Sequence, residues 1–168
     1  MSTFLYFAYG SNMLLRRLRQ RTPSATVVNV GYVSCRRLTF DKVSRDGSGK
    51  CDIESTINLT DRAYGVLYEV SSSEKPELDK AEGLENGYDQ HDVLVTTKSG
   101  ETHTATTYIA THKEPALWPY HWYKALVIAG ALEHQLPNDY IEWIRTFDSK
   151  SDPNAKRRAE KEALLFSS

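Results

Sequence analysis

A short turn after the first apolar segment carries residue types that suit an anionic ligand. Gly10, Ser11 and Asn12 follow residues 4–8, whose aromatic content and length predict a buried strand, and helical spacing resumes at Leu14. Backbone N–H groups at such a strand-to-helix turn point into the crevice beyond it, and the helix start adds partial positive charge. Gly10 lets the backbone approach a ligand closely. The turn predicts an anion cradle, although Ser11 or Asn12 could equally cap an ordinary helix.

Glu82 is the acidic residue whose surroundings favour proton transfer. It is the last residue of a predicted short helix and precedes Gly83 and Leu84. Unsatisfied carbonyls at the helix end and partial burial both disfavour a carboxylate's charge, which raises its pKa toward the range useful to a general base. The alternative interpretation is a surface acid on an amphipathic helix. Glu85 is the second candidate for the base.

Metal and covalent chemistry receive little support. Cys35 and Cys51 stand far apart without a C-x-x-C pattern, and the five histidines match no metal-binding spacing. We expect reduced thiols and no metal site. No G-x-S-x-G elbow surrounds Ser11, so a hydrogen-bonding role is favoured over a covalent serine mechanism.

The composition fits one globular domain. A length of 168 residues with 40% hydrophobic content allows a real core. The formal net charge of -1 gives no overall attraction to nucleic acid or to an anionic membrane. The arginines at 16, 17, 19 and 21 predict a solvated face rather than a phosphate-binding patch. No apolar run approaches the roughly 20 residues of a membrane span, and the N-terminus lacks a signal-peptide pattern. We expect a cytoplasmic protein with neither nucleic acid nor membrane as a partner.

Alternation of apolar and polar residues predicts about seven strands. Besides residues 4–8, the segments are 25–33, 37–43, 51–59, 63–70, 88–97 and 102–110. Turn residues at 46–49 and 98–101 predict two hairpins. Short connections favour an antiparallel or mixed sheet that curls on itself over a doubly wound sheet.

Three helices interrupt the strand pattern. The first begins at Ser73 as an N-cap, has Pro76 in its first turn, and stops at Gly83. The second covers about 119–135, and the third follows Pro137 through residue 147. We therefore expect a domain over 1–148, followed by a charged tail over 149–168 that is either a loosely attached helix or disordered.

Two motifs in this order resemble the γ-glutamylcyclotransferase family. Its Tyr-Gly-Ser-Asn hallmark is present at residues 9–12, and its Leu-Asp-x-x-Glu-Gly segment is present at 78–83. Further similarity covers 64–68, Tyr123 with Lys124, and residues near 130–137, so that the resemblance extends from about 3 to 144. It implies an α+β fold: a small mixed, mostly antiparallel β-barrel of about six or seven strands with flanking helices. Family relatives also suggest a homodimer.

The resemblance implies a role for each matching residue. Glu82 would be the general acid/base, Asn12 would support the loop, and Tyr123 would help to close the pocket. On its helix alone, Tyr123 fits a core position equally well. The glutamyl head would be bound, mainly through backbone groups, by Tyr6, Phe7, Ala8, Tyr9, Gly10 and Ser11.

The implied reaction releases 5-oxoproline and a free amine or amino acid from a γ-glutamyl amide. The substrate's α-amino group attacks its own γ-carbonyl, so no cofactor is needed, and Glu82 moves the proton. Amides of the turn at 10–12 would hold either the α-carboxylate or the oxyanion. An alternative is a non-catalytic module of the same fold that binds or senses a γ-glutamyl or carboxylate ligand. A third interpretation, an interaction protein acting through Lys156, Arg157 and Arg158, is less simple than a solvated helix face.

Overall fold

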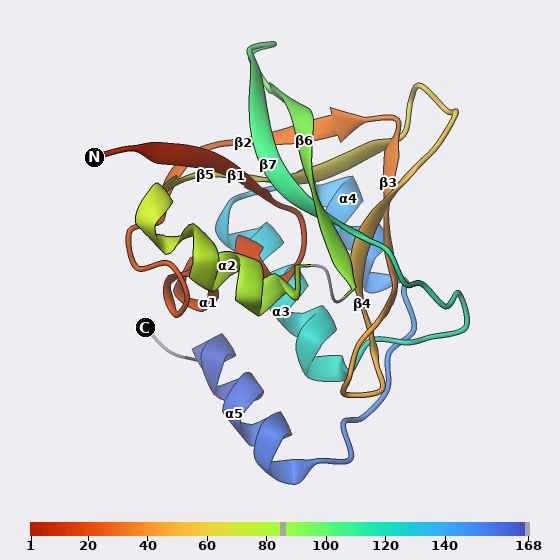
Figure 1. Cartoon of the computed structure of the whole chain (residues 1–168). Helices are drawn as coiled ribbons and strands as arrows, with labels where there is room; N and C mark the ends of the chain where they lie inside the picture. The colour runs from red at the N-terminus through yellow and green to blue at the C-terminus, as the bar shows by residue number, and fades with distance from the viewer. Residues whose placement is uncertain (85–86, 167–168) are drawn as a thin grey trace.

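Five strands close into a barrel, as the computed structural model in Figure 1 shows. The structure describes residues 1–84 and 87–166. The barrel order is β1-β5-β2-β6-β7, and β1 meets β7 in parallel at Tyr6 and Thr106, whereas the other barrel pairs are antiparallel. The bounds are β1 Thr3–Ala8, β2 Thr26–Ser34, β5 Arg62–Ser71, β6 Tyr88–Thr97 and β7 Thr102–Ala110.

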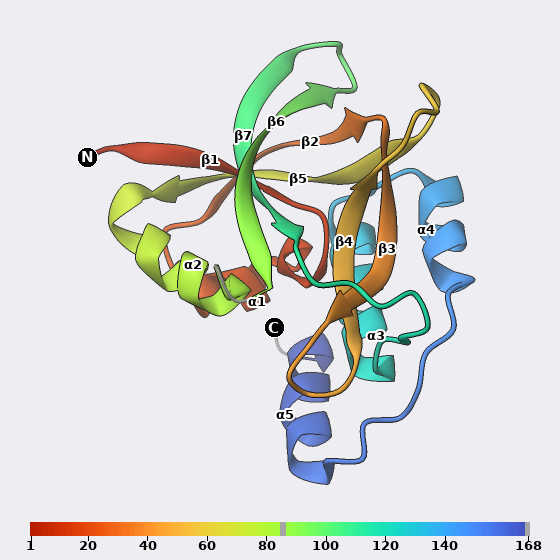
Figure 2. The same cartoon turned by 45° about the vertical axis from the view of Figure 1, so that its right-hand side comes forward.

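The remaining strands, β3 (Arg36–Val43) and β4 (Gly49–Ser55), form a separate two-stranded hairpin. The predicted α+β barrel with flanking helices is confirmed, and so are both hairpins at 46–49 and 98–101. The predicted count of six or seven barrel strands was too high, because β3 and β4 pair with each other outside the barrel. Figure 2 shows this hairpin standing beside the barrel, across from α1 and α2.

Two predicted boundaries were wrong for local reasons. The strand expected over 51–59 ends at Ser55, because Asn58 turns the chain by accepting hydrogen bonds from the backbone N–H and side-chain hydroxyl of Thr60. The helix expected from Ser73 is preceded by a 3₁₀ turn over Ser72–Glu74, so that α2 covers Lys75–Glu82. Pro76 lies in the first turn of α2 as predicted.

Helices flank the barrel and the hairpin. The short helix α1 (Leu15–Arg19) follows a 3₁₀ turn, η1 (Ser11–Met13). The helix α3 (His121–Glu133) packs against η1, α4 (Asn138–Arg145) and α5 (Ala155–Phe166). Within the described part of the chain, no helix is long and apolar enough to span a membrane.

The C-terminal helix α5 is docked on the molecule. Leu164 is buried, and Arg16 donates hydrogen bonds to the carbonyls of Leu164 and Leu165. At the other end of α5, Asp152 accepts hydrogen bonds from Arg157 and from the indole N–H of Trp122 on α3. Of the two states that the sequence left open for this tail, the described residues adopt the helix.

Candidate active site

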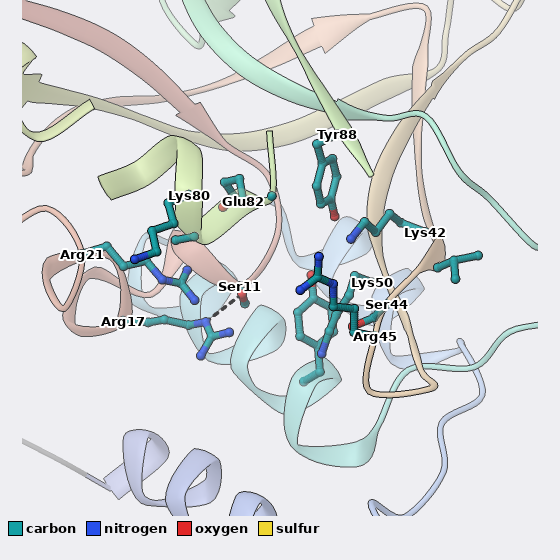
Figure 3. Close-up of a pocket in the computed structure, with 14 residues that line it drawn as sticks. Ser11, Arg17, Arg21, Lys42, Ser44, Arg45, Lys50, Lys80, Glu82 and Tyr88 are labelled. Carbon is teal, nitrogen blue, oxygen red and sulfur yellow. Dashed lines mark hydrogen bonds between the residues drawn. The ribbon is translucent and has the colours of Figure 1, made fainter. Parts of the chain in front are cut away.

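Two adjoining hollows lie between the barrel, α2 and the β3–β4 hairpin. The inner notch has a volume of about 30 Å³ and is lined by Tyr6, Tyr9, Gly10, Ser11, Asn12, Cys51, Glu82, Tyr88, Thr107, Tyr108 and Tyr123. The outer cleft has a volume of about 490 Å³. The residues common to both hollows are Ser11, Glu82, Tyr88 and Tyr123. These four residues therefore mark the junction of the hollows. Figure 3 shows the outer cleft and labels three of them, Ser11, Glu82 and Tyr88.

Glu82 lies at this junction because it is the last residue of α2. Gly83 adopts a left-handed conformation with φ 66°, which glycine accepts without steric cost, and its N–H bonds to carbonyls in the last turn of the helix. The predicted end of the helix is confirmed. Glu85, the alternative base, lies outside the described residues.

Asn12 and Tyr6 hold the Glu82 carboxylate. Asn12 Nδ2 donates to Glu82 Oε1 at 2.5 Å, and Tyr6 Oη donates to the same oxygen at 3.5 Å. Asn12 Nδ2 also donates to Tyr6 Oη at 3.1 Å, while Asn12 Oδ1 accepts from Arg21 Nη1 at 2.6 Å. Because a guanidinium can only donate, Arg21 sets the orientation of the Asn12 amide and turns its NH₂ group toward Glu82.

Burial raises the pKa of Glu82 above that of an ordinary glutamate. Arg21, Arg17 and Lys42 lower this pKa electrostatically, as does the hydrogen bond from Tyr6, but burial outweighs them. Burial, followed by the nearby Glu82 charge, raises the pKa of Tyr6 well above 10, so that Tyr6 stays a neutral donor at neutral pH. The prediction of a carboxyl with raised proton affinity is confirmed, with burial as its main cause.

The turn at 10–12 packs too tightly for a side chain at its first residue. A Cβ on Gly10 would lie 3.1 Å from Cys51 Cβ and 3.4 Å from Tyr123 Oη. Neither the 3₁₀ turn nor α1 has a side-chain cap, so the helix-capping alternative does not apply to Ser11 or Asn12. Ser11 Oγ instead accepts a hydrogen bond from Arg17 Nε at 2.9 Å.

Tyr123 is both a core residue and a wall of the site. It is only 5% exposed, and its Oη accepts the backbone N–H of Cys51 at 3.0 Å. Tyr88 donates to the carbonyl of the same cysteine at 2.6 Å. These two tyrosines thus fix β4 against the junction of the hollows.

The predicted binding segment divides into two sets. Tyr6, Tyr9, Gly10, Ser11 and Asn12 line the inner notch, together with Glu82 and Tyr123. Phe7 and Ala8 line neither hollow; they are buried in the core, where the carbonyl of Phe7 accepts a hydrogen bond from Thr107. Among the described residues, no group of three or more His, Cys, Asp or Glu side chains is placed to hold a metal ion.

The outer cleft has basic walls that the sequence analysis missed. The described residues that line it include Arg17, Arg21, Lys42, Arg45, Lys50 and Lys80. The expectation that 16, 17, 19 and 21 form a solvated face was wrong at Arg17, which is 6% exposed and lines the cleft. The four-residue spacing of Arg17 and Arg21, directly after the Tyr-Gly-Ser-Asn motif, is the signal that could have identified them.

Comparison with known proteins connects this site to one family. A family model described as the AIG2-like family matches residues 62–144. γ-Glutamylcyclotransferases from Mus musculus and Homo sapiens are each 34% identical over 153 residues, which cover 87% of this chain and 79% of theirs. A solved structure of a γ-glutamyl cyclotransferase superposes with a TM-score of 0.88 at 30% identity, covering 98% of this chain and 99% of that one. At this identity over most of both chains, the chain belongs to the γ-glutamylcyclotransferase family.

Proposed function

We propose that this protein is a γ-glutamylcyclotransferase that converts a γ-glutamyl amide into 5-oxoproline and a free amine or amino acid. The names of its relatives support this reaction class. The observation that carries the proposal is the Glu82 carboxylate, held by Asn12 and Tyr6 at the junction of the two hollows.

The reaction needs only positioning and proton transfer. The α-amino nitrogen of the substrate attacks its γ-carbonyl carbon, a five-membered lactam forms, and the amide C–N bond to the leaving amine breaks. Glu82 accepts the proton from the α-ammonium group and delivers it to the departing nitrogen. General acid–base catalysis of this kind contributes about 10²- to 10⁴-fold, and well-aligned intramolecular attack reaches effective molarities of about 10⁵ M and above.

The dimensions of the hollows suggest where the substrate lies. The inner notch, at about 30 Å³, is much smaller than the outer cleft, at about 490 Å³, so most of the substrate belongs in the outer cleft. We place its reacting carbonyl at the junction beside Glu82, with the turn at 10–12 on one side and the leaving group in the outer cleft.

The alternative is a module that only binds or senses a ligand, and it does not explain the raised pKa of Glu82. Ligand capture requires no carboxyl with raised proton affinity, whereas proton transfer does.

We also propose a cytoplasmic location, because Cys35 and Cys51 are both free, as is usual for proteins of reducing compartments.

The test is an assay of 5-oxoproline formation from a panel of γ-glutamyl dipeptides and amines. We expect Glu82→Gln to fold and to lose turnover by at least about 100-fold. Glu77→Gln is the matched control, since Glu77 is an exposed glutamate on the same helix, and it should retain full activity. Full activity of Glu82→Gln would remove this residue from the mechanism. Absence of 5-oxoproline across the panel, with binding intact, would favour the sensing module.

A further inference from the structure

The outer cleft concentrates positive charge on a molecule that has almost none overall. Its described lining includes six basic residues and a single acidic one, Glu82, whereas the formal net charge of the chain is -1. Lys50 has an acidic partner, Asp46, at 3.0 Å. Arg17 and Arg21 donate hydrogen bonds to neutral side chains, Ser11 and Asn12. The cleft therefore carries more positive charge than its own carboxylates balance.

The cations face one another across the cleft. In Figure 3, Arg17, Arg21 and Lys80 lie on the wall formed by α1, the chain after it, and α2. On the opposite wall, Lys42, Arg45 and Lys50 project from the β3–β4 hairpin. A group that enters between the two walls meets positive charge from both sides.

Two of these cations, Arg17 and Lys50, are partly removed from water, which disfavours their charged forms. Burial lowers the pKa of Arg17 to about 10, with a further contribution from Arg21. Burial also lowers the pKa of Lys50 to about 8, although Asp46 opposes the shift. An anion placed in the cleft would offset this effect, because it would add negative charge beside Arg17, whose hydrogen bond to Ser11 supplies none, and beside Lys50, whose ion pair among the described residues is with Asp46 alone.

We propose that the preferred leaving group is an acidic amino acid, which carries a side-chain carboxylate in addition to its α-carboxylate. This inference rests on the proposed function, because it places the leaving group in the outer cleft. A γ-glutamyl conjugate of a neutral amino acid has two carboxylates, and its own ammonium group offsets one of them. An aspartate or glutamate leaving group adds a further carboxylate that the cleft's cations can pair.

The cleft has room for such a group. Its volume of about 490 Å³ lies within the range of about 300–1,000 Å³ that small-molecule sites occupy. The hydrogen-bond donors on both walls suit carboxylate oxygens, to which charge-assisted bonds are roughly twice as strong as neutral ones.

The experiment compares isosteric substrates that differ by one charge. We measure kcat/KM for 5-oxoproline release from γ-glutamyl-aspartate against γ-glutamyl-asparagine, and from γ-glutamyl-glutamate against γ-glutamyl-glutamine. We expect the acidic substrate of each pair to react about 10- to 100-fold faster. The preference should shrink as salt increases from 0.05 to 0.5 M, because salt screens charges in a solvent-open cleft.

Variants locate the preference in the cleft. Arg45 and Lys80 are exposed cations on opposite walls, so the double variant Arg45→Gln/Lys80→Gln should fold and should lower the acid-to-amide ratio about 3- to 10-fold. Lys98→Gln is the matched control, since Lys98 is exposed in the turn between β6 and β7 and lines neither hollow. It should leave the ratio unchanged.

Each contrary outcome has a distinct meaning. Equal turnover of the acid and amide substrates would overturn the specificity inference and leave the cyclotransferase proposal standing. A preference that the double variant does not reduce would overturn its assignment to these cations. Failure to release 5-oxoproline from any conjugate would overturn the proposed function, and the inference with it.

Discussion

Glu82 is half-buried at a place where the neutral form of its carboxyl is favoured, and this predicts an effect of pH on stability. Its pKa is higher in the folded protein than in the unfolded chain, where a glutamate has a pKa of about 4.3. The folded protein therefore binds the proton more tightly, and its stability falls as pH rises through the interval between these two pKa values. The destabilising effect of the charged form is fully present above the folded pKa.

Glutamine cannot ionise, so Glu82→Gln should be more stable than the wild type at pH 7, and this advantage should vanish below about pH 4. Urea unfolding of both proteins at the two pH values measures the difference. Glu77→Gln should show no such pH-dependent gain, because Glu77 is exposed. A variant that is destabilised equally at both pH values would contradict this account of Glu82.

Asn12 accepts a hydrogen bond from Arg21 and donates one to Glu82. We expect its substitution to reduce catalytic activity more than the stability of the fold. Asn12→Ala removes the donor to Glu82 Oε1, and we expect kcat/KM to fall about 10- to 100-fold. The acid limb of the pH profile should move to higher pH, because the ionised carboxylate loses a hydrogen bond. Asn29→Ala, at an exposed position of β2, is the control. An unshifted acid limb would show that Asn12 acts only as a structural residue.

Sequence reasoning found Glu82 and Asn12 but not the charged walls around them, for a physical reason. Asn12 and Glu82 lie in two short contiguous motifs, residues 9–12 and 78–83, which can be recognised in the sequence itself. Arg17 and Lys50, in contrast, line the same cleft, and this cleft exists only after the β3–β4 hairpin has packed beside the barrel. Spacing shows that residues share a helix face, but not what that face will contact.

Among the elements, α3 and β4 are joined by one buried hydrogen bond whose removal should be costly. Tyr123→Phe leaves the backbone N–H of Cys51 without its acceptor inside the protein, at a cost of about 1–3 kcal/mol in the free energy of unfolding. Tyr140→Phe is an informative comparison, because Tyr140 Oη is buried without a hydrogen-bond partner among the described residues. That substitution should cost little or should stabilise. Similar losses for both variants in urea unfolding would contradict this assignment.

The strands could be predicted from the sequence, but their pairing could not. Apolar content and alternation predicted the seven strands of the described residues, since both signals lie within each strand's own sequence. It could not separate β3 and β4 from the barrel, because pairing partners depend on contacts between distant segments. Likewise, the charged composition of 149–168 left the state of the tail open, whereas Arg16 and Trp122 contribute to its docking from elsewhere in the chain.

At the scale of the whole molecule, the site is built from parts that do not all belong to the barrel. The barrel strands β1, β6 and β7 line the inner notch together with the turn at 10–12, α2, α3 and β4, while the β3–β4 hairpin supplies one wall of the outer cleft. A ligand that spans the junction contacts both parts at once. Binding should therefore stabilise the folded protein as a unit, since the unfolded chain has no such site.

This gives a prediction that does not depend on turnover. Glu82→Gln should bind γ-glutamyl substrate without consuming it, and a ligand at 100 times its Kd stabilises a folded protein by about 2.7 kcal/mol. For a chain of 168 residues this corresponds to a rise in Tm of about 5–10 °C, measurable by calorimetry. Hydrogen exchange should slow in the β3–β4 hairpin as well as in α2, because the ligand bridges them. Protection confined to α2 would mean that the outer cleft takes no part in binding, and an unchanged Tm would mean that the Glu82→Gln protein does not bind the substrate.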